Sequence, residues 1–350
     1  MIKNARTLIT SGVLFVLLAL LVTLLPMPYV IWSPGRTYNF LAEVDSVPVI
    51  SVESFDVYET NDQVLLAKIS TTSPSLPPSL LSVFFAYLSP NQEVLPTASV
   101  IDGSEPSLIG NVGTSSPSVR KTNSIVAALR EAARSEPGIF VQPLPMVTSV
   151  SASGTAAGIL QVGDLVIAID KTYPATALEV VEAIEAHKTP ESVLIEFMRD
   201  GVLREEAIPT RDSTTDPGTA TIGAAFGLGF RYEPEVDVIP EWVELSEGMM
   251  LSIAVYDLLT PGDLAGGGVV AGAGTVDAAG GVGRVDGIVE RIAAAERDHA
   301  RAFVIPEANC EDLRGKPNIR LISVRKLDDA LKGIQSVFSS QAQEPVKGCE

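Results

Sequence analysis

The hydrophobic and polar positions of this chain separate an apolar N-terminal segment from a longer remainder of mixed periodicity. Residues 8–32 carry no charged side chain, and 13–25 is apolar apart from one threonine. A helix needs about 20 consecutive apolar residues to cross a bilayer. Lys3 and Arg6 precede the run, and positive residues favour the cytoplasmic side. The pattern predicts a single-pass anchor within 1–32, with the N-terminus in the cytoplasm and the bulk of the chain outside the cell membrane. A cleaved signal peptide is the alternative.

The next stretch, 33–136, mixes the two periods of regular structure. Alternating or continuous apolar runs at 49–57 and 63–71 predict strands. Apolar positions spaced three and four apart predict helices at 79–88 and 123–135. We expect a first extracytoplasmic region of mixed α/β structure here. No residue pattern within it indicates a particular chemistry.

The segment 137–211 has a more specific order of elements. A strand is expected at 146–150, then a glycine-rich turn, a strand at 165–169, a helix at 176–187 and a strand at 193–199. This order, and above all the run G-T-A-A-G-I-L-Q-V-G-D-L-V-I-A-I-D, resembles a bacterial PDZ domain.

The PDZ resemblance implies capture of an extended peptide, often by its C-terminus, through strand addition. The groove is then expected between a strand and the helix that faces it. On the strand side the candidate residues are Gly138, Ile139, Phe140 and Val141, and on the helix side they are Val180, Val181 and Ile184. The alternative is a PDZ-like scaffold that holds no peptide.

The C-terminal part, 212–350, contains two stretches that stand out, L-T-P-G-D-L at 259–264 and V-I-P-E-A-N-C at 304–310. They resemble the Lon-type proteolytic domain. The order of parts over nearly the full chain is similar to the bacterial membrane-anchored PDZ–Lon-like serine-lysine protease family. The resemblance implies an α+β fold: an N-terminal transmembrane helix, a mixed α/β first region, a PDZ-like domain, and a Lon-type domain with a C-terminal tail.

That family cuts peptides with a serine nucleophile and a neutral lysine base. The resemblance places Ser246 at the nucleophile position, Arg291 at the lysine position and Ala273 at the position of a dyad-orienting threonine. An arginine keeps its proton near neutral pH because its pKa is above about 12, and no lysine lies between positions 188 and 316. Glu247 would put a negative charge where an oxyanion forms. We therefore expect a catalytically impaired homologue that acts in peptide or protein binding or regulation.

Other interpretations of these positions stay open. Ser246 as a helix cap and Arg291 as one half of an ion pair would be structural roles. The alternative function is an active, ATP-independent serine endopeptidase that degrades exported proteins. Ser246 would then be the nucleophile, and Asp286, Glu290 or His299 would replace the lysine as base.

The composition and motifs of the chain indicate which classes of partner and cofactor are not expected. The formal net charge of −18 argues against a nucleic-acid partner, which needs a basic surface. No G-x-x-x-x-G-K-[ST] loop is present, so no ATP site is expected. We expect no cofactor and no metal site, since the two histidines lie far apart and no C-x-x-C pair occurs. Export permits a disulfide between Cys310 and Cys349, with two free thiols as the alternative. Lon-type domains assemble into rings, so the resemblance allows a homo-oligomer.

Overall fold

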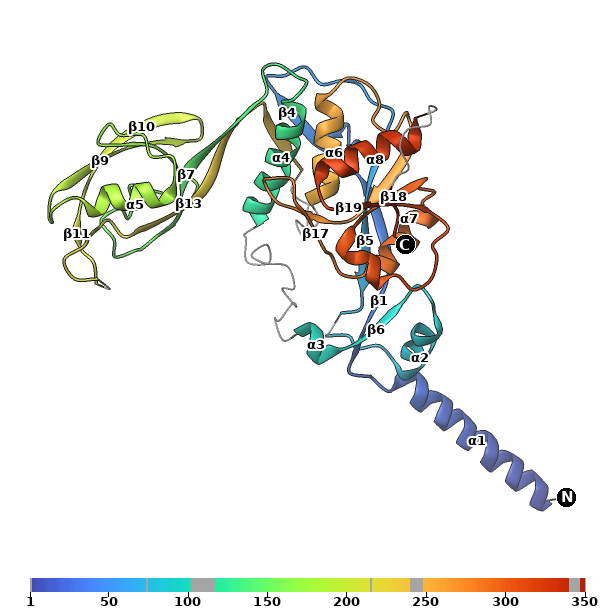
Figure 1. Cartoon of the computed structure of the whole chain (residues 1–350). Helices are drawn as coiled ribbons and strands as arrows, with labels where there is room; N and C mark the ends of the chain where they lie inside the picture. The colour runs from blue at the N-terminus through green and yellow to red at the C-terminus, as the bar shows by residue number, and fades with distance from the viewer. Residues whose placement is uncertain are drawn as a thin grey trace. The chain divides into compact units, whose positions relative to one another are not determined.

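The computed structural model describes residues 2–73, 75–101, 117–214, 216–239, 248–339 and 347–349 (Figure 1). The chain forms two compact units. Unit 1 consists of 1–136 together with 236–350, and unit 2 consists of 137–235. Unit 2 is therefore inserted between two segments that fold together. Helices and strands occur in both units, so the fold is of the mixed α+β type that the sequence predicts.

The centre of unit 1 is a six-stranded sheet whose strands come from both of its segments. The order across the sheet is β19 (Arg320–Val324), β18 (Ala302–Pro306), β15 (Val269–Gly272), β5 (Gln63–Thr71), β1 (Tyr29–Asn39) and β6 (Glu93–Pro96). The first four strands are parallel, and β1 is antiparallel to both of its neighbours. Because β5 pairs with β15, the regions 33–136 and 212–350, which the sequence analysis treated separately, share one sheet.

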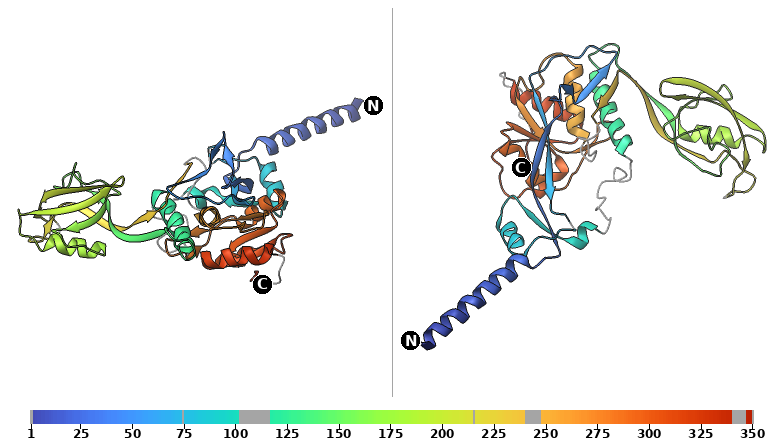
Figure 2. Two further views of the ribbon diagram at one scale, coloured as in Figure 1. Left: turned by 90° about the horizontal axis from the view of Figure 1, so that it is seen from above. Right: turned by 180° about the vertical axis from the view of Figure 1, so that it is seen from behind.

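Helices cover both faces of this sheet (Figure 2). α6 (Gly248–Leu259) packs against α4 (Pro117–Ala132), α8 (Leu327–Phe338) and β5, and α7 (Ile288–Arg297) packs against β1, β5 and β15. Successive strand residues point to opposite faces. Accordingly, Ala271 belongs to the buried cluster beneath α7, whereas Gly272 lies against Met250 of α6. α6 is buried along its whole length except at Tyr256 and Leu258, which explains why its sequence is apolar on nearly every side.

The remaining elements of unit 1 are short, apart from the N-terminal helix. They are α1 (Ile2–Leu24), α2 (Leu80–Leu88), α3 (Thr97–Ile101), β2 (Glu43–Val44), β3 (Val47–Pro48), β4 (Ile50–Glu53), β14 (Glu235–Val238), β16 (Thr275–Val276), β17 (Val282–Gly283) and the 3-10 helix η2 (Glu307–Asp312). α1 occupies the segment where the sequence predicts an anchor. Within the described ranges, no helix has the length and apolar character needed to cross a membrane, so the predicted transmembrane helix gains no support from the structure.

Unit 2 is a five-stranded antiparallel sheet with one helix against it. The order is β10 (Val202–Pro209), β9 (Ser192–Arg199), β8 (Leu165–Ile169), β7 (Phe140–Val150) and β13 (Ala224–Glu233); the other elements are α5 (Ala177–Glu185) and the short pair β11 (Arg211–Asp212) and β12 (Ala220–Thr221). Val180 and Ile184 of α5 pack into a buried cluster with Val147, Val166 and Phe197 of the sheet. β13 lies beyond position 211, where the sequence-based PDZ-like domain ended, so the unit extends further along the chain.

Two buried carboxylates hold the loop that joins α6 to β15. Asp257 accepts hydrogen bonds from the backbone N–H of Leu264 at 2.9 Å and from the hydroxyl of Thr60 at 2.8 Å. Asp62 accepts from the backbone N–H groups of Ala265 and Gly267. The L-T-P-G-D-L stretch therefore owes its position to these two acids. Burial is the main cause that raises the pKa of Asp257 to about 6, and it also raises the pKa of Asp62.

Asp257 predicts a pH dependence of the free energy of unfolding. Its pKa is about 6 in the folded chain and about 3.9 in an unfolded one. Because the folded value is the higher, the contribution of this group is complete below about pH 4 and is lost as the pH rises through about 6. The two pKa values correspond to a difference of about 3 kcal/mol. Asp257→Asn cannot ionise, so the fall in stability between pH 4 and pH 7 should shrink by up to about that amount.

Urea unfolding at several pH values measures this effect. Asp45→Asn is a suitable control, because it makes the same chemical change on an exposed turn. If Asp257→Asn and Asp45→Asn show the same pH slope as the parent chain, the buried ionisation of Asp257 does not contribute to stability.

Candidate functional site

Arg291, at the position of the expected lysine base, is used to fasten α7 to the sheet. Arg291 is only 5% exposed. Nη1 donates to the carbonyl oxygen of Ala67 in β5 at 2.7 Å, and Nε donates to the carbonyl oxygen of Asp286 at 2.8 Å. A guanidinium stays protonated and has no acceptor. This position therefore supplies no base, and it links the first turn of α7 to β5.

Ala273 and the start of α6 lie close together. Ala273 is fully buried after β15, in a cluster that also contains Ile288 of α7 and Phe303 of β18. The N–H of Met249, in the first turn of α6, donates to the carbonyl oxygen of Gly274 at 3.0 Å. The structure thus brings together the start of α6, the residue after Ala273 and the first turn of α7. Ser246 itself and Glu247 lie outside the described residues.

Glu290, one of the three candidate substitute bases, is buried, and its burial changes its pKa. It is 1% exposed, and its Oε1 accepts no hydrogen bond within the part of the chain that the structure describes. Burial, above all other causes, raises its pKa. Asp286 uses its backbone carbonyl to accept from Arg291, and His299 lies in the turn after α7 with a positive φ of 59°.

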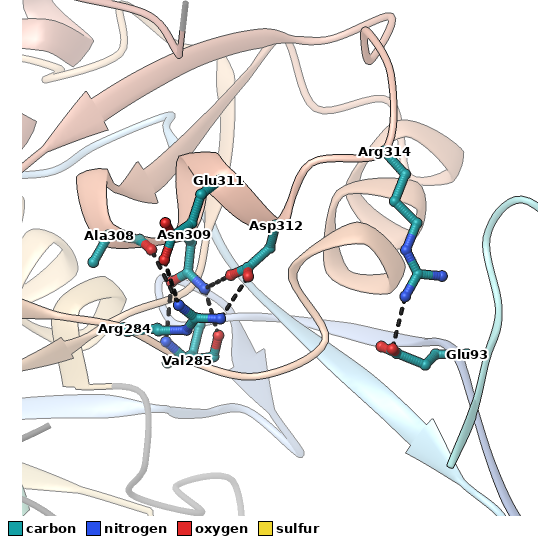
Figure 3. A network of polar contacts seen from close by, with 8 residues as sticks. All are labelled: Glu93, Arg284, Val285, Ala308, Asn309, Glu311, Asp312 and Arg314. Atoms are coloured by element: carbon teal, nitrogen blue, oxygen red, sulfur yellow. Dashed lines mark hydrogen bonds and ion pairs between the residues drawn. The ribbon is translucent and has the colours of Figure 1, made fainter. Parts of the chain in front are cut away.

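A polar network fixes the loop before α7, and Figure 3 shows it. The side-chain amide of Asn309 accepts from the N–H of Val285 at 3.0 Å and donates to its carbonyl oxygen at 2.7 Å. Arg284 pairs with Glu311 and Asp312 of η2. Within the V-I-P-E-A-N-C stretch, the asparagine therefore has a structural role: its hydrogen bonds position the segment that leads into α7.

A disulfide links η2 to the C-terminal tail. Cys310 and Cys349, which the sequence analysis pairs, are bonded in the structure with their Cα atoms 5.3 Å apart. The carbonyl oxygen of Lys347 accepts from the N–H of Ser323 in β19 at 2.8 Å. The end of the chain is thus held against η2 and β19. No cluster of three or more potential metal ligands occurs among the described side chains.

In unit 2, the residues predicted to line a peptide groove fall into two groups. Gly138 and Ile139 precede β7, while Phe140 and Val141 begin it and pair with Glu233 and Tyr232 of β13. The helix residues Val180 and Ile184 are core, and Val181 is half-buried. β7 lies between β8 and β13, so β7 is an inner strand and β13 is the edge strand beside it.

Two prolines show which way the backbone of β13 faces. Pro143 pairs with Phe230, and Pro145 pairs with Leu228. Pairs in an antiparallel ladder alternate between hydrogen-bonded and non-hydrogen-bonded. Because proline has no N–H to donate, these pairs fit the non-hydrogen-bonded positions. The N–H and C=O of Leu228 then point away from β7, toward the outer edge of β13.

The hydrogen bonds of Val147 show the same outward orientation at the next non-hydrogen-bonded pair of the ladder. Its N–H donates to Asp164 and its carbonyl oxygen accepts from Gly163, both at 2.9 Å and both on the side away from β13. Its partner in the ladder is Phe226. The backbone groups of Phe226 therefore also face outward. The backbone groups of Phe226 and Leu228 thus face the outer edge of β13, and Leu228 is 63% exposed.

The stretch F-G-L-G-F at 226–230 explains how β13 packs so closely on β7. A Cβ at Gly227 would lie 2.8 Å from Thr148, and one at Gly229 would lie 2.6 Å from Met146. Glycine at both positions permits the close approach. Phe226 packs on the cluster that contains Val180 of α5, so the edge strand and the helix are neighbours. Sequence reasoning missed this edge, although the alternation of glycine and large apolar residues was a signal for it.

Comparisons with known proteins match part of the chain. No protein-family model matches it, and no curated protein does. Among solved structures, it is similar to the PDZ domain of an SdrC-like protein from Listeria monocytogenes, with 25% identity, 23% of this chain and 85% of that chain covered, and a TM-score of 0.22. It is also similar to the PDZ domain of an SdrC-like protein from Listeria innocua, with 28% identity, 24% and 92% covered, and a TM-score of 0.22. A structure from Geobacillus thermodenitrificans has 26% identity, 23% and 93% covered, and a TM-score of 0.21.

These neighbours agree with a PDZ-like region in the chain. They cover less than a quarter of it, and at such TM-scores the likeness carries no weight for function. The Lon-type resemblance gains no support from them and stays a prediction.

The contacts of Arg291 predict that it matters for stability. Arg291→Ala removes two charge-assisted hydrogen bonds and leaves the carbonyl oxygens of Ala67 and Asp286 without these donors. We expect the free energy of unfolding to fall by about 3 kcal/mol. Arg320→Ala, on an exposed position of β19, should change it by less than about 0.5 kcal/mol. Urea unfolding compares the two, and equal effects would contradict a structural role for Arg291.

Proposed function

We propose that this chain binds extended peptide segments along the outer edge of β13, beside α5. The observation that carries the proposal is the orientation of Phe226 and Leu228, whose backbone N–H and C=O groups face outward on the edge strand of the sheet. An extended peptide adds to such an edge by main-chain hydrogen bonds, and neighbouring side chains then select its sequence. This edge replaces residues 138–141, at the start of β7, as the strand side of the groove.

The charge of the chain favours a basic ligand. α5 exposes Glu182 and Glu185 and contains no basic residue. The net charge of the whole chain is −18. A peptide that carries lysine or arginine would be attracted to this surface, whereas an acidic one would be repelled. The peptides captured are therefore extended segments with basic side chains.

Unit 1, in this proposal, is a Lon-type-like domain that does not cut. The support is the bonding of Arg291 to two backbone carbonyl oxygens, which leaves its position without a base. Peptide capture in unit 2 would then serve adaptor or regulatory work, and peptidase action through Ser246 is the alternative outcome of the test below.

The compartment belongs to the same proposal. The Cys310–Cys349 disulfide supports a location outside the cytoplasm, because disulfides persist in oxidising compartments. We place both units on the extracytoplasmic side of the cell membrane, with the N-terminus in the cytoplasm.

Leu228 provides the test of the binding edge. Leu228→Pro removes the outward N–H, and the sheet loses no ladder hydrogen bond because that N–H faces away from β7. Each main-chain hydrogen bond contributes about 1 kcal/mol, so we expect affinity for a basic decapeptide selected from a random library to fall about fivefold. Fluorescence anisotropy with the labelled peptide and the full chain measures the loss.

Leu203→Pro is the matched control. Leu203 is the same residue type with a similar exposure of 58%, and it lies on β10, the opposite edge of the same sheet. It should leave binding unchanged. An equal loss in both variants would contradict the assignment of the edge. Turnover of the peptide by the parent chain that disappears in Ser246→Ala would contradict the non-cutting role of unit 1.

A further inference from the structure

α2 is an apolar helix that the described part of the chain leaves largely exposed. Its nine residues, L-L-S-V-F-F-A-Y-L, include one buried side chain, that of Ala86. Phe84, Phe85, Tyr87 and Leu88 are 55%, 61%, 79% and 62% exposed. A soluble protein seldom exposes so many large apolar side chains on one short element, and such patches mark interaction surfaces.

Backbone hydrogen bonds fix the start of α2 beside the end of α1. The N–H of Leu80 donates to the carbonyl oxygen of Leu25 at 3.1 Å, and the N–H of Met27 donates to that of Pro78 at 2.9 Å. Figure 1 shows α2 at the point where α1 joins the sheet of unit 1. The exposed side chains of α2 and of α1 therefore form one continuous surface, which we call the α1–α2 lobe (residues 9–25 and 80–88).

The α1 part of the lobe indicates what covers it. Val13, Leu14, Phe15, Val16, Leu17 and Leu18 are consecutive, and each is at least 52% exposed. Consecutive helical residues point in directions about 100° apart, so these six exposed side chains surround the helix. A protein groove covers one face of a helix, whereas lipid covers every face.

The distribution of charge favours the same occupant. Residues 7–35 and 69–92 contain no Asp, Glu, Lys or Arg, although charged residues make up 19% of the chain. Both uncharged stretches meet in the lobe. With a net charge of −18 elsewhere to repel anionic head groups, attachment would be apolar and independent of acidic lipids.

We propose that α2 is a membrane-contacting helix, whose aromatic side chains lie in the interfacial layer of a lipid bilayer next to α1. Phe84 and Phe85 enter the boundary of the acyl chains, and Tyr87 lies at the head groups, where amphipathic aromatic rings are enriched. The contact holds unit 1 at the membrane surface. This proposal rests on the membrane location proposed above, but not on peptide binding at β13, which belongs to unit 2.

Depth-dependent quenching tests the proposal on the full chain. Both native cysteines are in the disulfide, so a fluorophore can be attached selectively at Tyr87→Cys, and in separate chains at Val13→Cys and at Tyr173→Cys. Tyr173, in unit 2, is 73% exposed and serves as the matched control. Each chain is reconstituted with phosphatidylcholine vesicles that carry a nitroxide either at the head group or in the middle of the acyl chain.

We expect the label at 87 to be quenched several-fold more by the head-group nitroxide than by the mid-chain one, and the label at 173 by neither. In a chain that also carries Phe84→Ser and Phe85→Ser, quenching at 87 should fall while quenching at 13 stays. Absence of quenching at 87, with or without quenching at 13, overturns the proposal. Protection of the 87 label from aqueous iodide without vesicles, growing with protein concentration, would assign the lobe to a second copy and also overturn it.

Discussion

The parallel pairing of β5 with β15 is the interaction on which the rest of the structure depends. It joins residues 63–66 to 269–272 and so closes one sheet from two distant segments of the chain. Two further side chains add hydrogen bonds around it. Asp62, just before β5, binds the loop that leads into β15. Arg291 donates to Ala67 of β5 and so brings α7 onto the same strand.

Unit 2 is inserted in the chain between the two segments that this pairing joins. The chain leaves unit 1 after 136 and returns at 236, and the insert folds around its own antiparallel pairing of β7 with β13. Its sheet has two outer strands, β10 and β13. Only β13 has the helix α5 beside it together with outward backbone groups whose direction Pro143, Pro145 and Val147 define.

Local periodicity predicted the elements better than their partners. The strand expected at 63–71 is β5, and the one expected at 165–169 is β8, because alternating or continuous apolar residues mark a strand wherever it pairs. The pairing of β5 with β15 spans about two hundred positions and leaves no local trace. β13 was missed for a second reason: the glycines at 227 and 229 lower strand propensity, yet they are what its close packing requires.

At the candidate dyad too, the sequence predicted one property of a residue, and only the structure showed its contacts. Chemistry alone predicted that Arg291 cannot act as a base, because a guanidinium does not release its proton. The sequence did not reveal what Arg291 does instead, since its acceptors are carbonyl oxygens, which every residue carries. Asn309 is a comparable case: its motif was noticed, but its bonds to both backbone groups of Val285 appear only in three dimensions.

The most direct measurement of the central claim is residue-resolved amide hydrogen exchange of the full chain with and without a saturating basic peptide. A peptide added to the outer edge of β13 should slow exchange at Phe226 and Leu228, whose N–H groups face outward, and leave Gly227 and Gly229 unchanged, because theirs face β7. Protection confined to β10 or to the start of β7, with none at Phe226 and Leu228, would contradict the account.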